Sequence, residues 1–167
     1  NVVIGDRTII GDNVIIQSNT VLGGDAFYYR KVDGNFDRLI SVGNVIIENK
    51  VEIGNNCTID RGVTDSTIIG EGSVLDNLIQ VGHDTIIGKS VLIASHAAIA
   101  GCCVIEDEVT VWGQVGIASG NRVGKGAVLL GKTGVNRDLA CGKTYFGQLA
   151  EEFIDYLRKE VKVKNLK

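Results

Sequence analysis

The feature that most constrains the fold of this chain is an aliphatic residue that recurs at every sixth position. From Ile69 onward in steps of six, twelve of thirteen positions as far as Cys141 hold Ile, Leu or Val. The residue four places after each of these anchor positions is mostly small or β-branched, as at Thr85, Val91 and Ala97. Repeats of this length each form a short strand and a turn, and they are stable only when they stack. The pattern therefore predicts an all-β solenoid.

The same register occurs in two shorter runs before Ile69, from Ile4 to Leu22 and from Ile47 to Ile59. Residues 23–46 form a long insertion between these runs, and residues 63–66 form a short one. Three hexads, about 18 residues, make one triangular coil, and the coils stack at the strand spacing of about 4.8 Å. We expect the anchors to fill the interior of this prism and small residues to lie near its corners. Glycines are expected to supply the positive φ of the turns.

The composition agrees with a regular β stack and argues against several classes of protein. The chain has 22 glycines, no proline and only 5% aromatic residues, so its core must be built from Val, Ile, Leu and Ala. A net charge of −3 without a basic stripe argues against nucleic-acid binding. No apolar run approaches the ~20 residues that span a bilayer, so no membrane span is expected. Four cysteines without C-x-x-C spacing indicate reduced thiols and a cytoplasmic location.

The repeat stops after Cys141, and the end of the chain has a different period. From Gln148, the segment QLAEEFIDYLRKEV places apolar residues at helical spacing, with acids in its first turn and basic residues near its end. We therefore predict a β-helix over residues 1–147, with the insertion at 23–46, and a short α-helix with a basic tail over 148–167. The chain lacks an initiator methionine and begins within a repeat, which favours a fragment of a longer protein.

One of the two histidines lies in the stretch LDNLIQVGHDTIIG, residues 75–88. His83 occupies the third place of its hexad, and Gly101 occupies the same place three hexads later, so the two should stack one coil apart. This pair suits acyl transfer, because the imidazole can take a proton from an amine or hydroxyl while the glycine N–H stabilises an oxyanion. The alternative is a corner histidine that hydrogen-bonds to the backbone, since any two residues at this spacing stack.

Three segments resemble a known family more closely than the repeat alone does. GGDAFYY (residues 23–29), TIDRGVTDSTIIG (58–70) and LDNLIQVGHD (75–84) are similar to UDP-3-O-acylglucosamine N-acyltransferases, hexapeptide-repeat enzymes of lipid A synthesis. The resemblance covers nearly all of residues 1–147. It implies a left-handed parallel β-helix, although parallel crossovers are otherwise right-handed. It also implies a homotrimer with ligands bound between subunits.

The resemblance implies transfer of a hydroxyacyl chain from acyl carrier protein to the 2-amine of a UDP-glucosamine derivative. It also implies that the donor is the acyl-phosphopantetheine arm of the carrier and that no cofactor is bound permanently. The family's catalytic base falls on His83 and its oxyanion-hole glycine on Gly101. Substrate-binding residues are expected in the insertion and in the motif before the histidine, at Phe27, Tyr29, Asp76, Asn77 and Gln80. The chain departs from the family in lacking the preceding uridine-binding domain and a second histidine near Ser119.

The remaining candidates have simpler interpretations. His96 is expected to be structural or to line a groove, and no metal site is expected, because zinc needs three or more ligands and the chain has two histidines. Cys103 and Cys141 occupy repeat positions and are expected in the core, whereas Cys102 is expected to be exposed and unreactive. The basic residues near the C-terminus form either a solvated tail or a surface that attracts an acidic carrier protein.

Other functions stay open at the level of sequence. The alternatives within enzymes are an O-acyltransferase of the lipid A pathway and a coenzyme-A-dependent sugar acetyltransferase. A third alternative is a trimeric β-helix scaffold without catalysis. The insertion with its Phe-Tyr pair and the TIDRG segment favour the N-acyltransferase.

Overall fold

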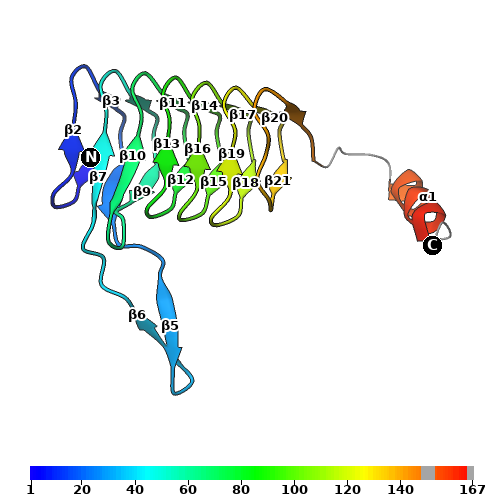
Figure 1. The fold of residues 1–167 in the computed structure, drawn as a ribbon, viewed down its shortest axis with the longest axis horizontal. Coiled ribbons are helices and arrows are strands. Elements are labelled where there is room, and N and C mark those ends of the chain that lie inside the picture. The colour runs from blue at the N-terminus through cyan, green and yellow to red at the C-terminus, as the bar shows by residue number, and fades with distance from the viewer. Residues whose placement is uncertain (148–152, 165–167) are drawn as a thin grey trace.

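The computed structural model describes residues 1–147 and 153–164, and most of them form a solenoid of parallel strands (Figure 1). The strands stack into three sheets, one on each side of a triangular prism. The first sheet contains β1 (Val3–Ile4), β4 (Val21–Gly24), β9 (Thr58–Asp60), β12 (Gln80–Val81), β15 (Ala98–Ile99), β18 (Gly116–Ile117) and β21 (Gly134–Val135). The second contains β2 (Ile9–Ile10), β7 (Asn44–Ile47), β10 (Ser66–Ile69), β13 (Ile86–Ile87), β16 (Val104–Ile105) and β19 (Arg122–Val123). The third contains β3 (Ile15–Ile16), β8 (Glu52–Ile53), β11 (Val74–Leu75), β14 (Leu92–Ile93), β17 (Thr110–Val111), β20 (Val128–Leu129) and β22 (Thr144–Tyr145).

The register of these sheets follows the hexad spacing. Val81 of β12 pairs with Ile99 of β15, and Ile87 of β13 pairs with Ile105 of β16, so residues 18 apart in the sequence lie side by side. All pairings within the three sheets are parallel. The architecture is the predicted left-handed parallel β-helix, with one helix, α1 (Phe153–Lys164), after it.

The core is a column of aliphatic side chains inside the prism. The anchor residues from Ile69 to Val135 are all buried, and so are the residues four places after the anchors from Ile69 to Leu129, among them Thr85 and Cys103. The corner hydroxyls are paired with backbone: Thr85 Oγ1 donates to the carbonyl of Ala100 and accepts from the N–H of Cys103. Burying a hydroxyl is tolerable only when it is paired in this way, which explains why polar residues are allowed at these corners.

The expectation that glycines supply the positive φ of the turns is wrong for most turns. The left-handed residue recurs every six positions and is mostly not glycine: Gly72, Leu78, Asp84, Ser90, His96, Cys102, Glu108, Gln114, Gly120, Gly126 and Lys132. Gly70 and Gly82, which directly follow anchors, have a different role. A Cβ on Gly70 would lie 2.4 Å from the carbonyl oxygen of Gly88, and one on Gly82 would lie 2.5 Å from the nitrogen of Gly101. These glycines allow successive coils to approach closely.

The prediction that Cys141 lies in the core is wrong. The last coil is two residues shorter than the regular 18-residue coils, because Val123 bridges to Leu139 and Leu129 pairs with Tyr145, each 16 residues away. The shorter coil turns Leu139 inward and leaves Cys141 exposed. The other two cysteine predictions are confirmed, since Cys103 is buried and Cys102 is exposed.

The long insertion forms an antiparallel hairpin of β5 (Tyr29–Val32) and β6 (Asn35–Arg38), which projects away from the early coils (Figure 1). Arg30 pairs with Asp37 across it. Phe27 at its base and Phe36 on β6 are highly exposed, at 83% and 76%.

At the other end of the chain, α1 confirms the predicted helix over residues 153–164, whereas 148–152 and 165–167 lie outside the described residues. The domain boundary at 147/148 therefore stays a prediction. Of the predicted basic surface, Arg158, Lys159 and Lys162 are exposed on α1. Within the described ranges, no helix is long and apolar enough to cross a membrane.

Candidate active site

A pocket of about 660 Å³ lies where the base of the hairpin meets the corner after the first sheet. The hairpin side contributes Asp25, Phe27 and Tyr28 to its lining. The solenoid contributes residues from four consecutive coils, represented by Asp60, His83, Gly101 and Ser119. The pocket exists because residues 18 apart stack, so one corner of the prism collects the same hexad position from successive coils.

His83 and Gly101 are in direct contact in this pocket. A Cβ on Gly101 would lie 2.5 Å from Nε2 of His83 and 2.6 Å from its Cε1. The imidazole therefore lies against the α-carbon of Gly101, and only glycine leaves room for it. The N–H of Cys102 donates to the carbonyl of His83 at 2.8 Å, which ties the two turns together.

The His83 ring is oriented by a carboxylate. Its Nδ1 lies 2.7 Å from Oδ2 of Asp84, and the residue is only 8% exposed. An ionised carboxylate only accepts hydrogen bonds, so in the neutral imidazole Nδ1 is the nitrogen that carries the proton and Nε2 is the one with the lone pair. The Tyr28 ring packs edge-on against the imidazole, with 5.5 Å between the ring centroids. These contacts hold the ring in one tautomer and one orientation.

Asp84 is itself held by the short insertion. Its carboxylate accepts hydrogen bonds from the backbone N–H groups of Val63 and Asp65, at 2.9 and 3.2 Å. Burial alone would raise the pKa of Asp84, but the hydrogen bonds from Val63, His83 and Asp65 outweigh it and lower that pKa. The carboxylate is therefore ionised at neutral pH.

Two polar groups of this pocket that suit acyl transfer make no hydrogen bond within the described residues. In the part of the chain that the structure describes, neither Nε2 of His83 nor the N–H of Gly101 has a hydrogen-bond partner. Ser119 from the next coil donates to the carbonyl of Gly101 at 2.7 Å and so fixes this peptide. A fixed N–H donor beside an imidazole lone pair can stabilise an oxyanion and accept a proton at the same carbon centre.

A second carboxylate lies at the solenoid side of the pocket. Asp60 accepts a hydrogen bond from Nε2 of Gln80 at 2.9 Å. Burial raises the pKa of Asp60, against the effects of Gln80 and His83. Asp25 at the hairpin base forms an ion pair with Arg61, at 3.7 Å. The pocket is thus rich in acidic groups.

The predicted substrate residues are divided between two faces of the chain. Phe27 and Gln80 line the His83 pocket. Tyr29 lies just outside it, edge-on to Phe27 at 5.1 Å and beneath the guanidinium of Arg38.

Asp76 and Asn77 lie elsewhere, in a pocket of about 450 Å³ on the third sheet beside Trp112. Asn77 Oδ1 accepts from the N–H of Asn55, and its Nδ2 donates to Asp76. Asn77 precedes His83 by one hexad, and one hexad turns the chain to the next corner of the prism. A single chain therefore does not bring this pair to His83.

Sequence reasoning missed four residues around the histidine: Tyr28, Asp60, Asp84 and Ser119. Asp84 had a usable signal, because it directly follows His83 and stands at the left-handed position of the turn. Ser119 could have been found from its spacing, since it occupies the same hexad place as Gly101 one coil later. Asp60 directly follows the anchor Ile59, which pairs with Val81, so it could have been found from the register of the anchors. The placement of Tyr28 depends on the path of the hairpin, which no repeat predicts.

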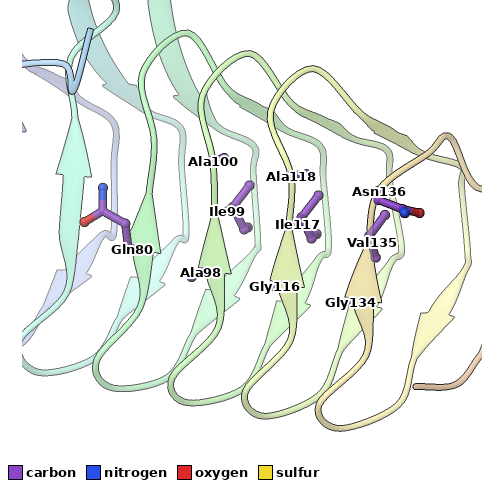
Figure 2. A pocket seen from close by; sticks show the side chains of 10 residues that line it. All are labelled: Gln80, Ala98, Ile99, Ala100, Gly116, Ile117, Ala118, Gly134, Val135 and Asn136. Carbon is purple, nitrogen blue, oxygen red and sulfur yellow. The ribbon is translucent and has the colours of Figure 1, made fainter. Parts of the chain in front are cut away.

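An apolar groove of about 570 Å³ continues from this pocket along the outer face of the first sheet. Figure 2 shows its lining, from Gln80 on β12 past β15 and β18 to β21. The outward residues of these strands are Ala98, Gly116 and Gly134, which are too small to fill the surface. Gln80, Ile99 and Ala100 belong to both the groove and the His83 pocket.

The chain is similar to several curated proteins that share one name. The chain is 36% identical over 160 residues to a UDP-3-O-acylglucosamine N-acyltransferase of Methylobacterium, covering 96% of the chain and 46% of the relative. It is 42% identical over 151 residues to the enzyme of that name from Rhizobium meliloti, covering 90% of the chain and 43% of the relative. The chain thus spans about half the length of the curated relatives it matches. No protein-family model matches it.

Solved structures give the same fold. A crystal structure of a UDP-N-acetylglucosamine acyltransferase superimposes with a TM-score of 0.80 at 25% identity, covering 99% of this chain and 64% of the other. The Francisella novicida enzyme of that name superimposes with a TM-score of 0.75, covering 95% of this chain and 65% of the other. Its identity is 20%, so this second likeness concerns the fold alone.

Fold and repeat place the chain in the class of hexapeptide-repeat proteins with a left-handed parallel β-helix. Within that class, the chain is a homologue of the UDP-3-O-acylglucosamine N-acyltransferases, as its resemblance predicted.

Replacement of Asp84 by asparagine should lower the free energy of unfolding, by an amount that depends on pH, because the carboxylate anchors the short insertion. At neutral pH we expect a loss of about 2 kcal/mol, because hydrogen bonds to a charged group are replaced by weaker ones. The pKa of Asp84 is lowered by folding, so its contribution is complete above the unfolded value of about 3.9 and is lost as the pH falls below it. Urea unfolding at pH 7 and at about pH 3 measures this. A stability difference that stayed constant between the two would contradict the assignment.

Proposed function

We propose that the protein transfers a hydroxyacyl chain from acyl carrier protein to the 2-amine of a UDP-3-O-acylglucosamine. The observation that carries the proposal is the contact between His83 and Gly101, in a chain homologous to enzymes of that name. The arrangement supplies the two groups that such a transfer needs, a base for the amine and a donor for the oxyanion.

In this mechanism Nε2 of His83 takes a proton from the amine while the nitrogen attacks the thioester carbonyl. A C–N bond forms, and the N–H of Gly101 stabilises the negative charge that develops on the carbonyl oxygen. The C–S bond then breaks, and the proton on His83 passes to the sulfur of the phosphopantetheine arm. Asp84 stabilises the imidazolium formed in between, because its carboxylate lies 2.7 Å from Nδ1.

The groove along the first sheet supports a site for the acyl chain. It is apolar, it begins at the His83 pocket, and Ala98 and Gly116 leave its floor open. Burying a methylene group there contributes about 0.8 kcal/mol. Phe27 and Tyr28 at the base of the hairpin face the same pocket and suit the packing of a nucleobase or sugar ring.

A homotrimer would complete this site. The second sheet and its corners carry ion pairs such as Arg122–Glu106 and Lys125–Glu108. The third sheet exposes apolar residues, among them Leu92 and Trp112, at 40% and 46%. We therefore assign the first and third sheets to the contact between copies, which would carry Asp76 and Asn77 toward a neighbour's groove.

We expect the protein to sediment as a trimer and the Trp112→Glu variant to sediment largely as a monomer, because a charge would be buried in the contact. Ile86→Glu is the matched control, since Ile86 is similarly exposed, at 43%, but lies on the second sheet. Sedimentation velocity distinguishes these states. A trimeric Trp112→Glu variant, or a monomeric Ile86→Glu variant, would contradict the assigned faces.

The function is tested with two donors and two acceptors. We expect transfer from hydroxyacyl carrier protein to UDP-3-O-acylglucosamine, with the product carrying an amide at the 2-position by mass spectrometry. Preference for acetyl-coenzyme A would indicate a sugar acetyltransferase, and preference for a UDP-sugar hydroxyl would indicate an O-acyltransferase. Absence of transfer with every pair by the folded protein would favour a scaffold. Each of these three results would overturn the proposal.

A further inference from the structure

Three potential metal ligands meet at the rim of the His83 pocket. One ligand atom each from His83, Asp84 and Cys102 lies within 4.8 Å of the other two. Two histidines in the sequence do not predict a metal site, but the stacked turns add a carboxylate and a thiol to one of them. Imidazole, carboxylate and thiolate are the ligands that Zn²⁺ takes in proteins, and three of them leave a fourth position open.

The three side chains are held in place before any metal binds. His83 is 8% exposed and packs between Tyr28 and Gly101. The Asp84 carboxylate is fixed by two backbone N–H groups. Cys102 stands at the left-handed position of the next turn, with φ of 61°, and its N–H is bonded to the carbonyl of His83. A site assembled in this way loses little conformational entropy on binding.

The surroundings favour a cation. Asp25 and Asp60 line the same pocket as His83 and Cys102 and add negative charge. One ring nitrogen of the buried His83 has no hydrogen-bond partner among residues 1–147 and 153–164. The other three cysteines lack this setting: Cys57 and Cys103 are buried in the core, and Cys141 is exposed beside Glu106.

We propose that His83, Asp84 and Cys102 bind Zn²⁺, and that the bound ion switches off acyl transfer. Binding replaces the thiol proton of Cys102, which is released to solvent. Because the Asp84 carboxylate contacts Nδ1, an ion held by both side chains binds at Nδ1. The proton of Nδ1 then moves to Nε2, so the base loses its lone pair, and the ring loses the hydrogen bond to Asp84 that orients it. The proposal of metal binding depends only on the three clustered side chains, whereas the proposal of inhibition rests on the function proposed for His83.

Binding is tested with Co²⁺, which replaces Zn²⁺ and reports a thiolate ligand by its charge-transfer absorption. The untagged protein is titrated under reducing, oxygen-free conditions, with Zn²⁺ competition at the end. We expect one ion per chain, loss of the absorption on Zn²⁺ addition, and an affinity lower by on the order of 100-fold in Cys102→Ser. Cys141→Ser is the matched control and should bind as the wild type does.

Absence of the thiolate band in the wild type would overturn the site. Its persistence in Cys102→Ser, or its loss in Cys141→Ser alone, would also do so. Circular dichroism of each variant shows whether the β-helix is intact.

The regulatory part is tested by measuring transfer with and without Zn²⁺. The rate of Cys102→Ser in the presence of a chelator sets its own reference, and relative to that rate the variant should resist inhibition by a Zn²⁺ concentration that stops the wild type. Equal inhibition of both proteins would overturn the regulatory role. Absence of transfer in the chelated wild type would contradict the proposed function, and the Co²⁺ result would still decide the metal site.

Discussion

His83→Ala is expected to lower the rate of acyl transfer by about 10³-fold, because general-base catalysis of this kind contributes 10²- to 10⁴-fold. The loss should appear in kcat, since the ring acts on the reacting amine. Thermal unfolding and sedimentation should change little, because the ring lies at a corner of the prism and outside the aliphatic core. Added imidazole should restore part of the activity by entering the space that the side chain leaves. Such rescue distinguishes a base from a residue that only shapes the pocket.

His96→Ala is the matched control. His96 is the other histidine of the chain, and it is exposed at a turn outside the linings of the His83 pocket and the groove. We expect its replacement to leave transfer within about twofold of the wild type. An active His83→Ala protein, or an equal loss in both variants, would show that the imidazole of His83 is not the base.

Gly101→Ala should lower transfer by on the order of 100-fold, although only one methyl group is added. The new Cβ would lie 2.5 to 2.8 Å from three atoms of the His83 ring, so the imidazole must move. Movement of the ring breaks its alignment with Asp84 and with the N–H of residue 101 at the same time. The strain should also cost about 1–3 kcal/mol of stability. Added imidazole should not rescue this variant, because the native ring still occupies the pocket.

Gly131→Ala is the matched control for this substitution. Gly131 occupies the same place in its hexad, and a Cβ there would come no closer than 3.4 Å to the carbonyl oxygen of Gly113. We expect normal transfer and a near-normal melting temperature. Double substitution of His83 and Gly101 by alanine should be no less active than His83→Ala alone, because both changes act through the His83 imidazole. A further loss in the double variant would show that the methyl group at position 101 disturbs more than this ring.

Most of the fold could be predicted from the period of the sequence. The anchors from Ile69 to Val135 are buried as the six-residue spacing requires, and the stacking of His83 on Gly101 follows from the same spacing. The prediction failed for Cys141, because the last coil has two residues fewer while its sequence continues the six-residue spacing of the earlier coils. The prediction that glycines supply the positive φ failed for most turns. Residues such as Leu78 and Cys102 adopt a positive φ there, because the stacking of the coils offsets the energetic cost of this conformation.

The sequence by itself determined the solenoid, its coil length and which residues share a corner, because a strict six-residue period lets only one set of side chains face inward. Only the tertiary structure decided what surrounds His83. The Asp84 carboxylate is positioned by Val63 and Asp65 of an insertion, and Tyr28 arrives from a hairpin that interrupts the repeat. The structure also decided that Asp76 and Asn77 lie on another face of the same chain. A repeat specifies neighbours one coil apart, whereas contacts made by insertions depend on their folded path through space.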